Sequence, residues 1–188
     1  MASRFKSIFP NLLTLSRGLF VILISILFFT DLNFKYILIY ILFLIASLSD
    51  YFDGKLARKW GVKTNFGVAF DSLLDKVFTF VMYVLLIPFN LVHTGVFIAL
   101  IFRDLIIDGV KNFSLSKGIP IAPKMTGKLK MLFQTLLINF GLLTLSYPEI
   151  NLFRNLLYFC SFLALLFSYY SGFQYLVDFQ NNHKKANK

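Results

Sequence analysis

Three long stretches of this sequence contain no Asp, Glu, Lys or Arg: residues 77–102, 131–148 and 155–177. A helix that spans a lipid bilayer needs about 20 mostly apolar residues to cross about 30 Å of hydrocarbon. Two shorter uncharged runs, 18–30 and 36–49, reach that length when their weakly polar flanks are included. With 57% hydrophobic and only 15% charged residues, the chain is neither an ordinary soluble enzyme nor a disordered protein. The sequence therefore predicts an all-α, polytopic membrane protein.

The longest uncharged run is expected to hold two helices, because Pro88, Asn90 and His93 indicate a tight connection inside it. Six transmembrane helices are then predicted, at residues 12–30, 35–52, 67–88, 91–111, 127–147 and 152–176. We expect the first span to be retained, since residues 30–33 offer no small-x-small cleavage pattern. A single domain over 1–188 would open with a short interfacial helix at 1–10 and end in a polar cytoplasmic tail at 178–188.

The positive charges are distributed very unequally across the predicted membrane. Of the 19 Lys and Arg, 17 lie in the N-terminal segment, the two long loops and the tail, and only Lys35 and Arg154 lie on the other side. This asymmetry predicts a multi-pass protein of the cell (inner, cytoplasmic) membrane with both termini and the active site cytoplasmic. The net charge of +10 favours anionic headgroups or a phosphorylated substrate as partners, and not nucleic acid. The single cysteine, Cys160, excludes an intramolecular disulfide.

Four of the nine acidic residues lie within 26 positions, as two pairs. Asp50 and Asp53 are three residues apart, and Asp71 and Asp75 are four apart, so each pair shares one helix face. Two antiparallel helices would bring both pairs together at their cytoplasmic ends. Such a cluster repels itself unless divalent cations bind there, and all-oxygen ligation favours Mg²⁺ or Mn²⁺.

Other interpretations of these residues stay open at this point. A structural salt-bridge network could neutralise the aspartates, since three cations lie nearby in sequence: Lys55, Arg58 and Lys76. A cation channel or transporter could also use membrane carboxylates, although those usually lie in the middle of a span. Small residues punctuate the same stretch, where they would admit a bulky ligand or only allow close helix packing: Gly54, Ala57, Gly61 and Gly67.

Together these residues form one extended motif. It comprises Asp50-Tyr-Phe-Asp53-Gly54-Lys-Leu-Ala57-Arg58, eight further residues, and Gly67-Val-Ala-Phe-Asp71-Ser-Leu-Leu-Asp75. The motif resembles the signature DxxDGxxAR(x8)GxxxDxxxD of the CDP-alcohol phosphatidyltransferases at all eight fixed positions. The resemblance implies six transmembrane helices, a homodimer, two bound divalent metal ions, and transfer of a phosphatidyl group from CDP-diacylglycerol to an alcohol with release of CMP.

The resemblance also implies roles for individual residues. Four aspartates would ligate Mg²⁺ or Mn²⁺: Asp50, Asp53, Asp71 and Asp75. Asp75 would in addition act as the catalytic general base on the acceptor hydroxyl. The donor-binding residues would be Asp53, Gly54, Ala57, Arg58, Gly67 and Asp71, with the small residues admitting cytidine and pyrophosphate and Arg58 donating to phosphate.

Basic residues deep in the later helices bear on the acceptor. Arg103 follows a long apolar run, about two helical turns from Lys111, where an unpaired cation is costly. We expect Asp104 or Asp108 to pair with it. An acceptor that carries its own phosphate would use such cations, whereas serine would not.

Further segments resemble the bacterial phosphatidylglycerophosphate synthases within that family. They are Arg103-Asp104 to Lys111, then Gly127-Lys128-Leu-Lys130, and the opening Pro10-Asn11-Leu12-Leu13-Thr14-Leu-Ser-Arg17. The implied substrate-binding residues are Thr14, Arg17, Arg103, Lys111, Lys128 and Lys130, with sn-glycerol 3-phosphate as acceptor and phosphatidylglycerophosphate as product of phospholipid biosynthesis. Lys128 and Lys130 are two residues apart and cannot share one helix face, so one of them is expected to serve lipid headgroups.

Two departures from that pattern leave other acceptors open. Asp104 stands where the pattern has Glu. Lys111 stands where the pattern has Arg, and a lysine cannot form the bidentate phosphate contact of an arginine. Inositol phosphate, serine or phosphatidylglycerol are the alternative acceptors. Three lysine side chains could instead extend to the lipid headgroups without binding substrate: Lys111, Lys124 and Lys130.

Overall fold

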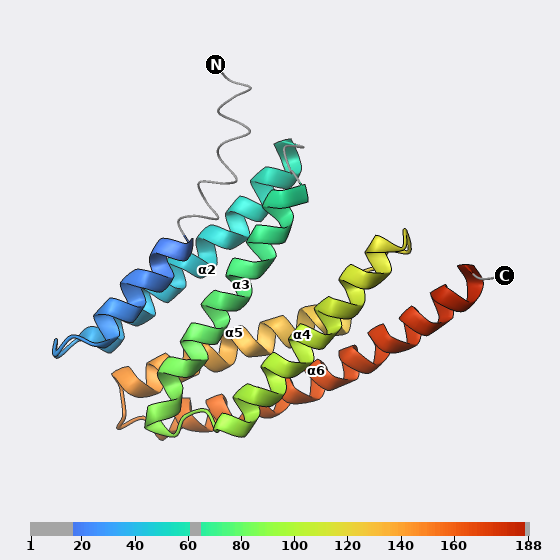
Figure 1. Cartoon of the computed structure of the whole chain (residues 1–188). Coiled ribbons are helices and arrows are strands. Elements are labelled where there is room, and N and C mark those ends of the chain that lie inside the picture. Colours follow the sequence, from blue (N-terminus) through green and yellow to red (C-terminus); the bar gives the residue numbers. More distant parts are fainter. Residues whose placement is uncertain (1–16, 61–64, 187–188) are drawn as a thin grey trace, which may run out of the picture. The chain divides into compact units, whose positions relative to one another are not determined.

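The computed structural model describes residues 17–60 and 65–186, with side chains described over 17–49 and 73–184. All regular structure in these residues is helical, which confirms the all-α prediction (Figure 1). The helices are Arg17–Phe28, α2 (Lys35–Trp60), α3 (Asn65–Leu86), the short 3₁₀ helix η1 (Ile87–Phe89), α4 (Thr94–Ser116), α5 (Met125–Ser146) and α6 (Asn151–Ala186). The predicted interfacial helix at residues 1–10 lies outside the described residues.

The predicted tight connection between the third and fourth helices is confirmed. Pro88 lies in η1, and Asn90 ends it in the left-handed conformation, with φ 55°. His93 then caps α4, since its Nδ1 accepts a hydrogen bond of 3.1 Å from the backbone N–H of Gly95. The sequence located this turn because its residues are those that tolerate or fix turn geometry.

Two helices extend well beyond the predicted spans. Helix α2 continues to Trp60 through the charged segment, and α6 continues to Ala186 through the predicted polar tail. A helix forms its hydrogen bonds internally, so it does not have to end where the apolar residues end. With 36 residues, α6 is about 54 Å long, more than a hydrocarbon layer of about 30 Å.

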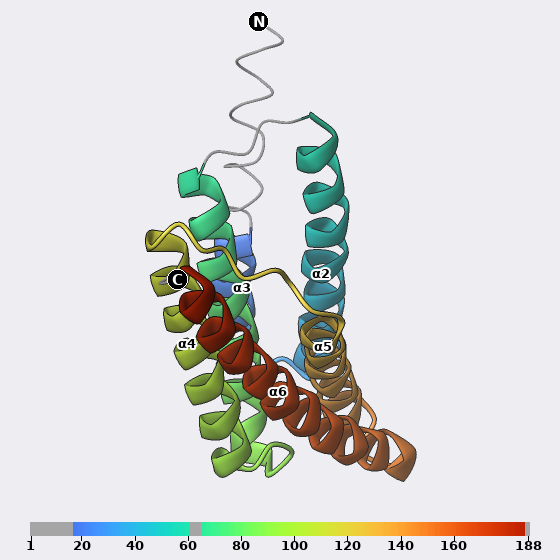
Figure 2. The same ribbon diagram turned by 90° about the vertical axis from the view of Figure 1, so that its right-hand side faces the viewer.

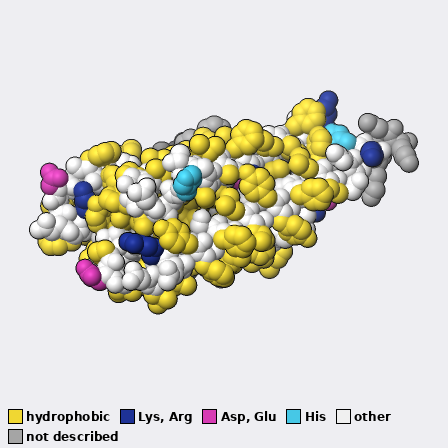
Figure 3. Space-filling model, turned by 90° about the horizontal axis from the view of Figure 1, so that it is seen from below, with side chains coloured by type: hydrophobic (Ala, Val, Ile, Leu, Met, Phe, Trp, Pro, Cys, Tyr) yellow, Lys and Arg dark blue, Asp and Glu magenta, His cyan; other side chains and the backbone are white. Residues whose placement is uncertain are grey.

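Within the described residues, α5 and α6 are long and apolar enough to cross a membrane, over Met125–Ser146 and Asn151–Lys184. Shorter apolar helices cover Arg17–Phe28 and Lys35–Ser49. Figure 3 shows hydrophobic side chains over much of the face in view. Large exposed apolar residues of α5 and α6 include Met131, Phe162 and Phe173, and such extensive apolar exposure is typical of a surface that faces lipid.

The chain divides into two compact units, and the first comprises Met1–Leu85 with Leu145–Pro148. Its core includes Ile24, Ile39 and Met82, all essentially inaccessible. Phe43 of α2 stacks on Phe78 of α3, with ring centroids 5.5 Å apart. These contacts hold α2 beside α3, the two helices that carry the aspartate motif.

The second unit comprises Leu86–Thr144 and Glu149–Lys188. Helix α4 packs against α6 (Figure 2). Phe133 of α5 stacks on Phe167 of α6 at a centroid distance of 5.4 Å. Leu100, Leu137 and Leu157 are completely buried in its core, yet the same core also contains charged and hydroxyl side chains.

Candidate active site

The first unit contains a pair of charged residues from two helices. Arg17, at the start of the helix Arg17–Phe28, donates from Nη1 to the Oδ1 atom of Asp75 in α3. Arg17 is buried, whereas the Asp75 side chain keeps 37% of its surface exposed. The contact orients the Asp75 carboxylate, and the exposed part of that side chain stays available to a cation or a substrate.

Most of the predicted donor and metal residues have side chains outside the described ones: Asp50, Asp53, Gly54, Ala57, Arg58, Gly67 and Asp71. Their backbone is described, and it is helical throughout α2 and α3. Asp50 and Asp53 therefore lie on one helix at positions i and i+3, and Asp71 and Asp75 lie on the next at i and i+4. Thr14 lies outside the described residues altogether.

The four predicted metal ligands are all aspartates, and carboxylate oxygens suit hard divalent cations. Among the residues with described side chains, no three His, Cys, Asp or Glu gather closely enough to hold a metal. Of the four predicted ligands, however, only Asp75 belongs to that part of the chain. Arg17 engages its Oδ1 atom, and the side chain remains partly exposed. An all-carboxylate set of this kind fits a hard divalent cation.

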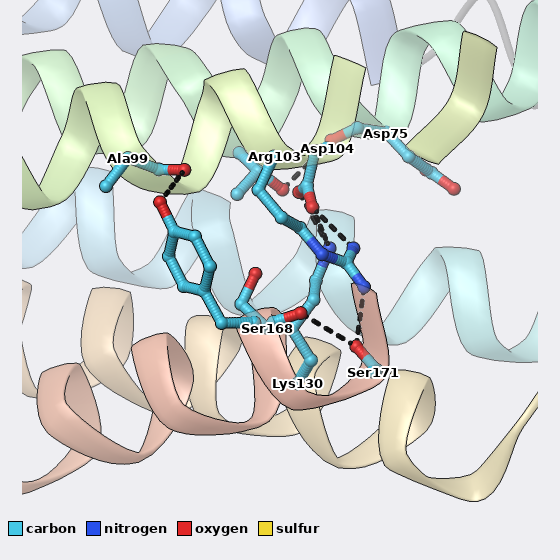
Figure 4. A network of polar contacts seen from close by, with 9 residues as sticks. Asp75, Ala99, Arg103, Asp104, Lys130, Ser168 and Ser171 are labelled. Carbon is cyan, nitrogen blue, oxygen red and sulfur yellow. Dashed lines mark hydrogen bonds and ion pairs between the residues drawn. The ribbon is translucent and has the colours of Figure 1, made fainter. Parts of the chain in front are cut away.

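The second unit buries a network of charged side chains, shown in Figure 4. Lys130 of α5 donates to both carboxylate oxygens of Asp104 in α4, at 2.7 Å each. Arg103 donates from Nη1 to Asp104 Oδ1 at 2.9 Å and from Nη2 to Ser171 Oγ of α6 at 2.5 Å. All four residues are less than 10% exposed. The predicted pairing of Arg103 with a neighbouring aspartate is confirmed, with Asp104 as the partner.

This network has more positive than negative charge and keeps unused hydrogen-bonding atoms. Two cations, Arg103 and Lys130, share the one carboxylate of Asp104. Within the described chain, the buried atoms of the unit without a hydrogen-bond partner include Arg103 Nε, Gln134 Nε2 and Ser168 Oγ. Buried polar groups are normally satisfied, so a polar or anionic ligand would find both charge and donors here.

Close approach of α6 to Arg103 depends on a glycine. A Cβ atom added at Gly172 would lie 3.1 Å from Arg103 Nε and 3.7 Å from its Cγ. That separation is tighter than most contacts of a real Cβ, so the glycine lets the arginine side chain lie against the α6 backbone. Ser171 and Gly172 thus complete the surroundings of Arg103.

The other predicted acceptor residues are not all brought into this network. Lys111 lies over the ring of Tyr175, with Nζ 3.9 Å from the centroid. Lys128 is exposed, whereas Lys130 is buried. The expectation that these two lysines serve different environments therefore agrees with the structure, and Lys130 is the one in the buried cluster. Lys124 forms an ion pair with Asp178 at 2.6 Å.

Sequence reasoning missed the contribution of α6. Its four residues follow a helical spacing within an uncharged run: Ser168, Ser171, Gly172 and Tyr175. This stripe of small and polar residues at positions i, i+3, i+4 and i+7 was the available signal, because polar side chains in an apolar helix normally face other protein groups.

Comparison with known proteins places the chain in one family. The CDP-alcohol phosphatidyltransferase family model matches residues 7–170. Three relatives are named CDP-diacylglycerol–glycerol-3-phosphate 3-phosphatidyltransferase. The protein of Mycoplasma pneumoniae is 37% identical over 52% of this chain and 43% of its own length. That of Mycoplasma genitalium is 34% identical over 78% of this chain and 65% of its own length.

The relative from Aquifex aeolicus is matched over most of both sequences. It is 33% identical over 168 residues, which cover 85% of this chain and 90% of the relative. The chain thus spans less than two thirds of the two Mycoplasma relatives but nearly all of this one. Since the family model covers most of the sequence and includes the whole aspartate motif, the chain belongs to the CDP-alcohol phosphatidyltransferase family.

Proposed function

We propose that this protein transfers the phosphatidyl group of CDP-diacylglycerol to sn-glycerol 3-phosphate, which yields phosphatidylglycerophosphate and CMP. The observation that carries the choice of acceptor is the buried pair of Arg103 and Lys130, which share the single carboxylate of Asp104. Two cations that share one carboxylate leave a net positive charge, which suits an acceptor that has its own phosphate. The names of the three relatives support the same acceptor.

In the reaction, the acceptor hydroxyl oxygen attacks the phosphorus that carries diacylglycerol. A new P–O bond forms, the P–O bond to CMP breaks, and CMP leaves with the bonding electrons. The proton of the hydroxyl goes to the carboxylate of Asp75, the proposed general base. Arg17 supports this role, because its contact with Oδ1 orients the carboxylate.

The proposed metal ligands are Asp50, Asp53, Asp71 and Asp75, for Mg²⁺ or Mn²⁺. Bound divalent ions would neutralise charge on the pyrophosphate of the donor. Gly54, Ala57 and Gly67 would leave the helix backbone open to that donor, and Arg58 would donate to its phosphate. The helical backbone of α2 and α3 supports this assignment, because it keeps each pair of aspartates on one helix face.

The proposed acceptor residues are Arg103, Lys130 and Lys111, with Thr14 and Lys128 assigned by resemblance alone. Arg103 Nε is a buried donor without a partner in the described chain, so a phosphate oxygen would satisfy it. Lys130 is held in place by two hydrogen bonds to Asp104 and still has a third N–H to donate. These two donors would give the phosphate a charge-assisted site away from bulk water.

We also propose six transmembrane helices, cytoplasmic termini and active site, an inner-membrane location and a homodimer. The apolar character of α5 and α6 and the asymmetry of Lys and Arg support the membrane arrangement. The homodimer is proposed from family resemblance.

The function is tested with purified protein, CDP-diacylglycerol, Mg²⁺ and a panel of acceptors, with CMP release as the readout. Glycerol 3-phosphate should give the fastest release. The Asp75→Asn variant should lose the reaction, whereas Asp31→Asn, at an exposed position, should retain it. Preference for inositol phosphate, serine or phosphatidylglycerol would overturn the acceptor, and ion flux that depends on Asp75 without phosphatidyl transfer would indicate a channel or transporter.

A further inference from the structure

One face of α6 presents three polar residues at successive helical turns. Ser171, Tyr175 and Asp178 occupy positions i, i+4 and i+7, so their side chains point to the same side of the helix. All three lie beyond residues 7–170, the part of the chain that the family model matches. The family signature therefore assigns them no role.

Each of these residues contacts a different cation of the second unit. Ser171 accepts from Arg103, as described above, and Asp178 pairs with Lys124. Tyr175, between them, meets Lys111. The same helix face thus contacts basic side chains from α4 and from the segment that leads into α5.

Tyr175 is the most constrained of the three. Its side chain is almost fully buried, at 3% exposure. Its hydroxyl oxygen accepts a hydrogen bond of 3.0 Å from the backbone N–H of Lys124. A Cβ atom added at Gly127 would lie 3.1 Å from that same oxygen. The hydroxyl and its close neighbours therefore fix the orientation of the ring.

The fixed ring supports the Lys111 ammonium group. A lysine has a long flexible side chain, and its Nζ would otherwise sample many positions. The distance of 3.9 Å from Nζ to the ring centroid is well within the range of a cation–π interaction. The loss of a cation–π interaction of this kind changes an equilibrium constant by a factor of roughly two to thirty.

We propose that Tyr175 is a positioning residue for the acceptor: its ring holds the Lys111 ammonium group where it binds the acceptor phosphate. This inference rests on the proposed function, because Lys111 is assigned to the acceptor there. Tyr175 itself touches no reacting atom. Its loss should therefore weaken binding of the acceptor and leave the chemical step largely intact.

The test compares KM and kcat of full-length variants in the CMP-release assay. Tyr175→Leu should raise KM for glycerol 3-phosphate about three- to tenfold, with kcat and the KM for CDP-diacylglycerol within about twofold of wild type. Tyr175→Phe keeps the ring but loses the hydroxyl that helps to fix it, so its KM for glycerol 3-phosphate should lie between those of wild type and Tyr175→Leu. Tyr170→Leu is the matched control, since Tyr170 lies on the same helix with its side chain 54% exposed, and it should leave every constant unchanged.

A double-mutant comparison separates positioning from general damage to the fold. If Tyr175 acts through Lys111, Tyr175→Leu should raise KM for glycerol 3-phosphate no further in a Lys111→Met background. Additive effects of the two changes would overturn the proposal. Should Tyr175→Leu fail to give folded protein by size exclusion, Tyr175→Met replaces it with the same expectations, since Met adapts well to irregular packing.

The outcomes also separate this inference from the proposed function. Wild-type protein that releases no CMP in response to glycerol 3-phosphate would overturn both. Active wild type with an unchanged acceptor KM in Tyr175→Leu would overturn the role of Tyr175 alone. A fall in kcat at constant KM would likewise overturn it, because positioning of a binding group would then not explain the defect.

Discussion

Lys130 on α5 donates hydrogen bonds to both carboxylate oxygens of Asp104 on α4, so one buried ion pair joins two helices. Arg103 shares the same carboxylate. Asp104 is therefore the carboxylate that Arg103 and Lys130 share in the described part of the chain. Removal of its charge would leave two buried positive charges without compensation, which is far more costly than loss of an exposed pair.

We accordingly expect Asp104→Asn to lower the stability of the protein by about 3 kcal/mol. For a chain of this size that corresponds to a fall of about 6–12 °C in Tm. Cys160 provides the measurement, because it is the only cysteine and is buried, so a thiol-reactive dye reports unfolding on heating. Asp104→Glu restores the charge and should retain most of the stability. A Tm of Asp104→Asn equal to that of wild type would show that the cluster is not held by this carboxylate.

The ion pair of Arg17 and Asp75 leads to a prediction about the rate. Arg17→Gln removes the cation that orients the proposed base, and a hydrogen bond to a charged group contributes about 1.5–3 kcal/mol. We expect kcat to fall about ten- to hundredfold at saturating donor and acceptor. Arg17→Lys keeps the charge and should lose less. Equal kcat values for wild type and Arg17→Gln would remove Arg17 from the mechanism.

The all-helical character of the described residues followed from the sequence, because long uncharged apolar runs of this length favour helices. The turn around Asn90 and His93 was predictable for local reasons, since it depends on a few residues close in the chain. The ends of α2 and α6 were not, because hydropathy reports the membrane boundary and not the end of the hydrogen-bonded helix.

For the site, spacing predicted that Lys128 and Lys130 would face different surroundings, but not which of them would be buried. That choice depends on which side of α5 meets α4 and α6, a property of the tertiary packing. The same limitation concealed Ser171 and Tyr175, whose partners Arg103 and Lys111 are more than 60 residues earlier in the sequence. Such pairs become visible only when the neighbouring helices are known.

Packing in the second unit makes a prediction independent of function. A Cβ atom added at Gly141 would lie 2.6 Å from Leu86 Cδ1, and Leu86 is completely buried. Overpacking of this kind usually costs about 1–3 kcal/mol, so Gly141→Ala should lower Tm. Gly109 is the matched control, because a Cβ added there meets nothing within 4 Å, and Gly109→Ala should leave stability unchanged or raise it. Rescue of Gly141→Ala by Leu86→Ala would confirm the contact, and a Tm unchanged in Gly141→Ala would contradict it.

The contrast between Lys130 and Lys128 provides the most direct test of the acceptor residues. Lys130→Met removes a buried ammonium group of the proposed phosphate site, and a charge-assisted hydrogen bond lost there corresponds to about ten- to hundredfold in KM for glycerol 3-phosphate. Lys128→Met removes an exposed charge on the same helix and should change that KM much less, since exposed charges are screened by solvent and salt. Both variants should bind CDP-diacylglycerol like wild type. If Lys128→Met raised that KM more than Lys130→Met, the exposed Lys128 would be the residue that binds the acceptor phosphate. Lys130 would then be only a structural partner of Asp104.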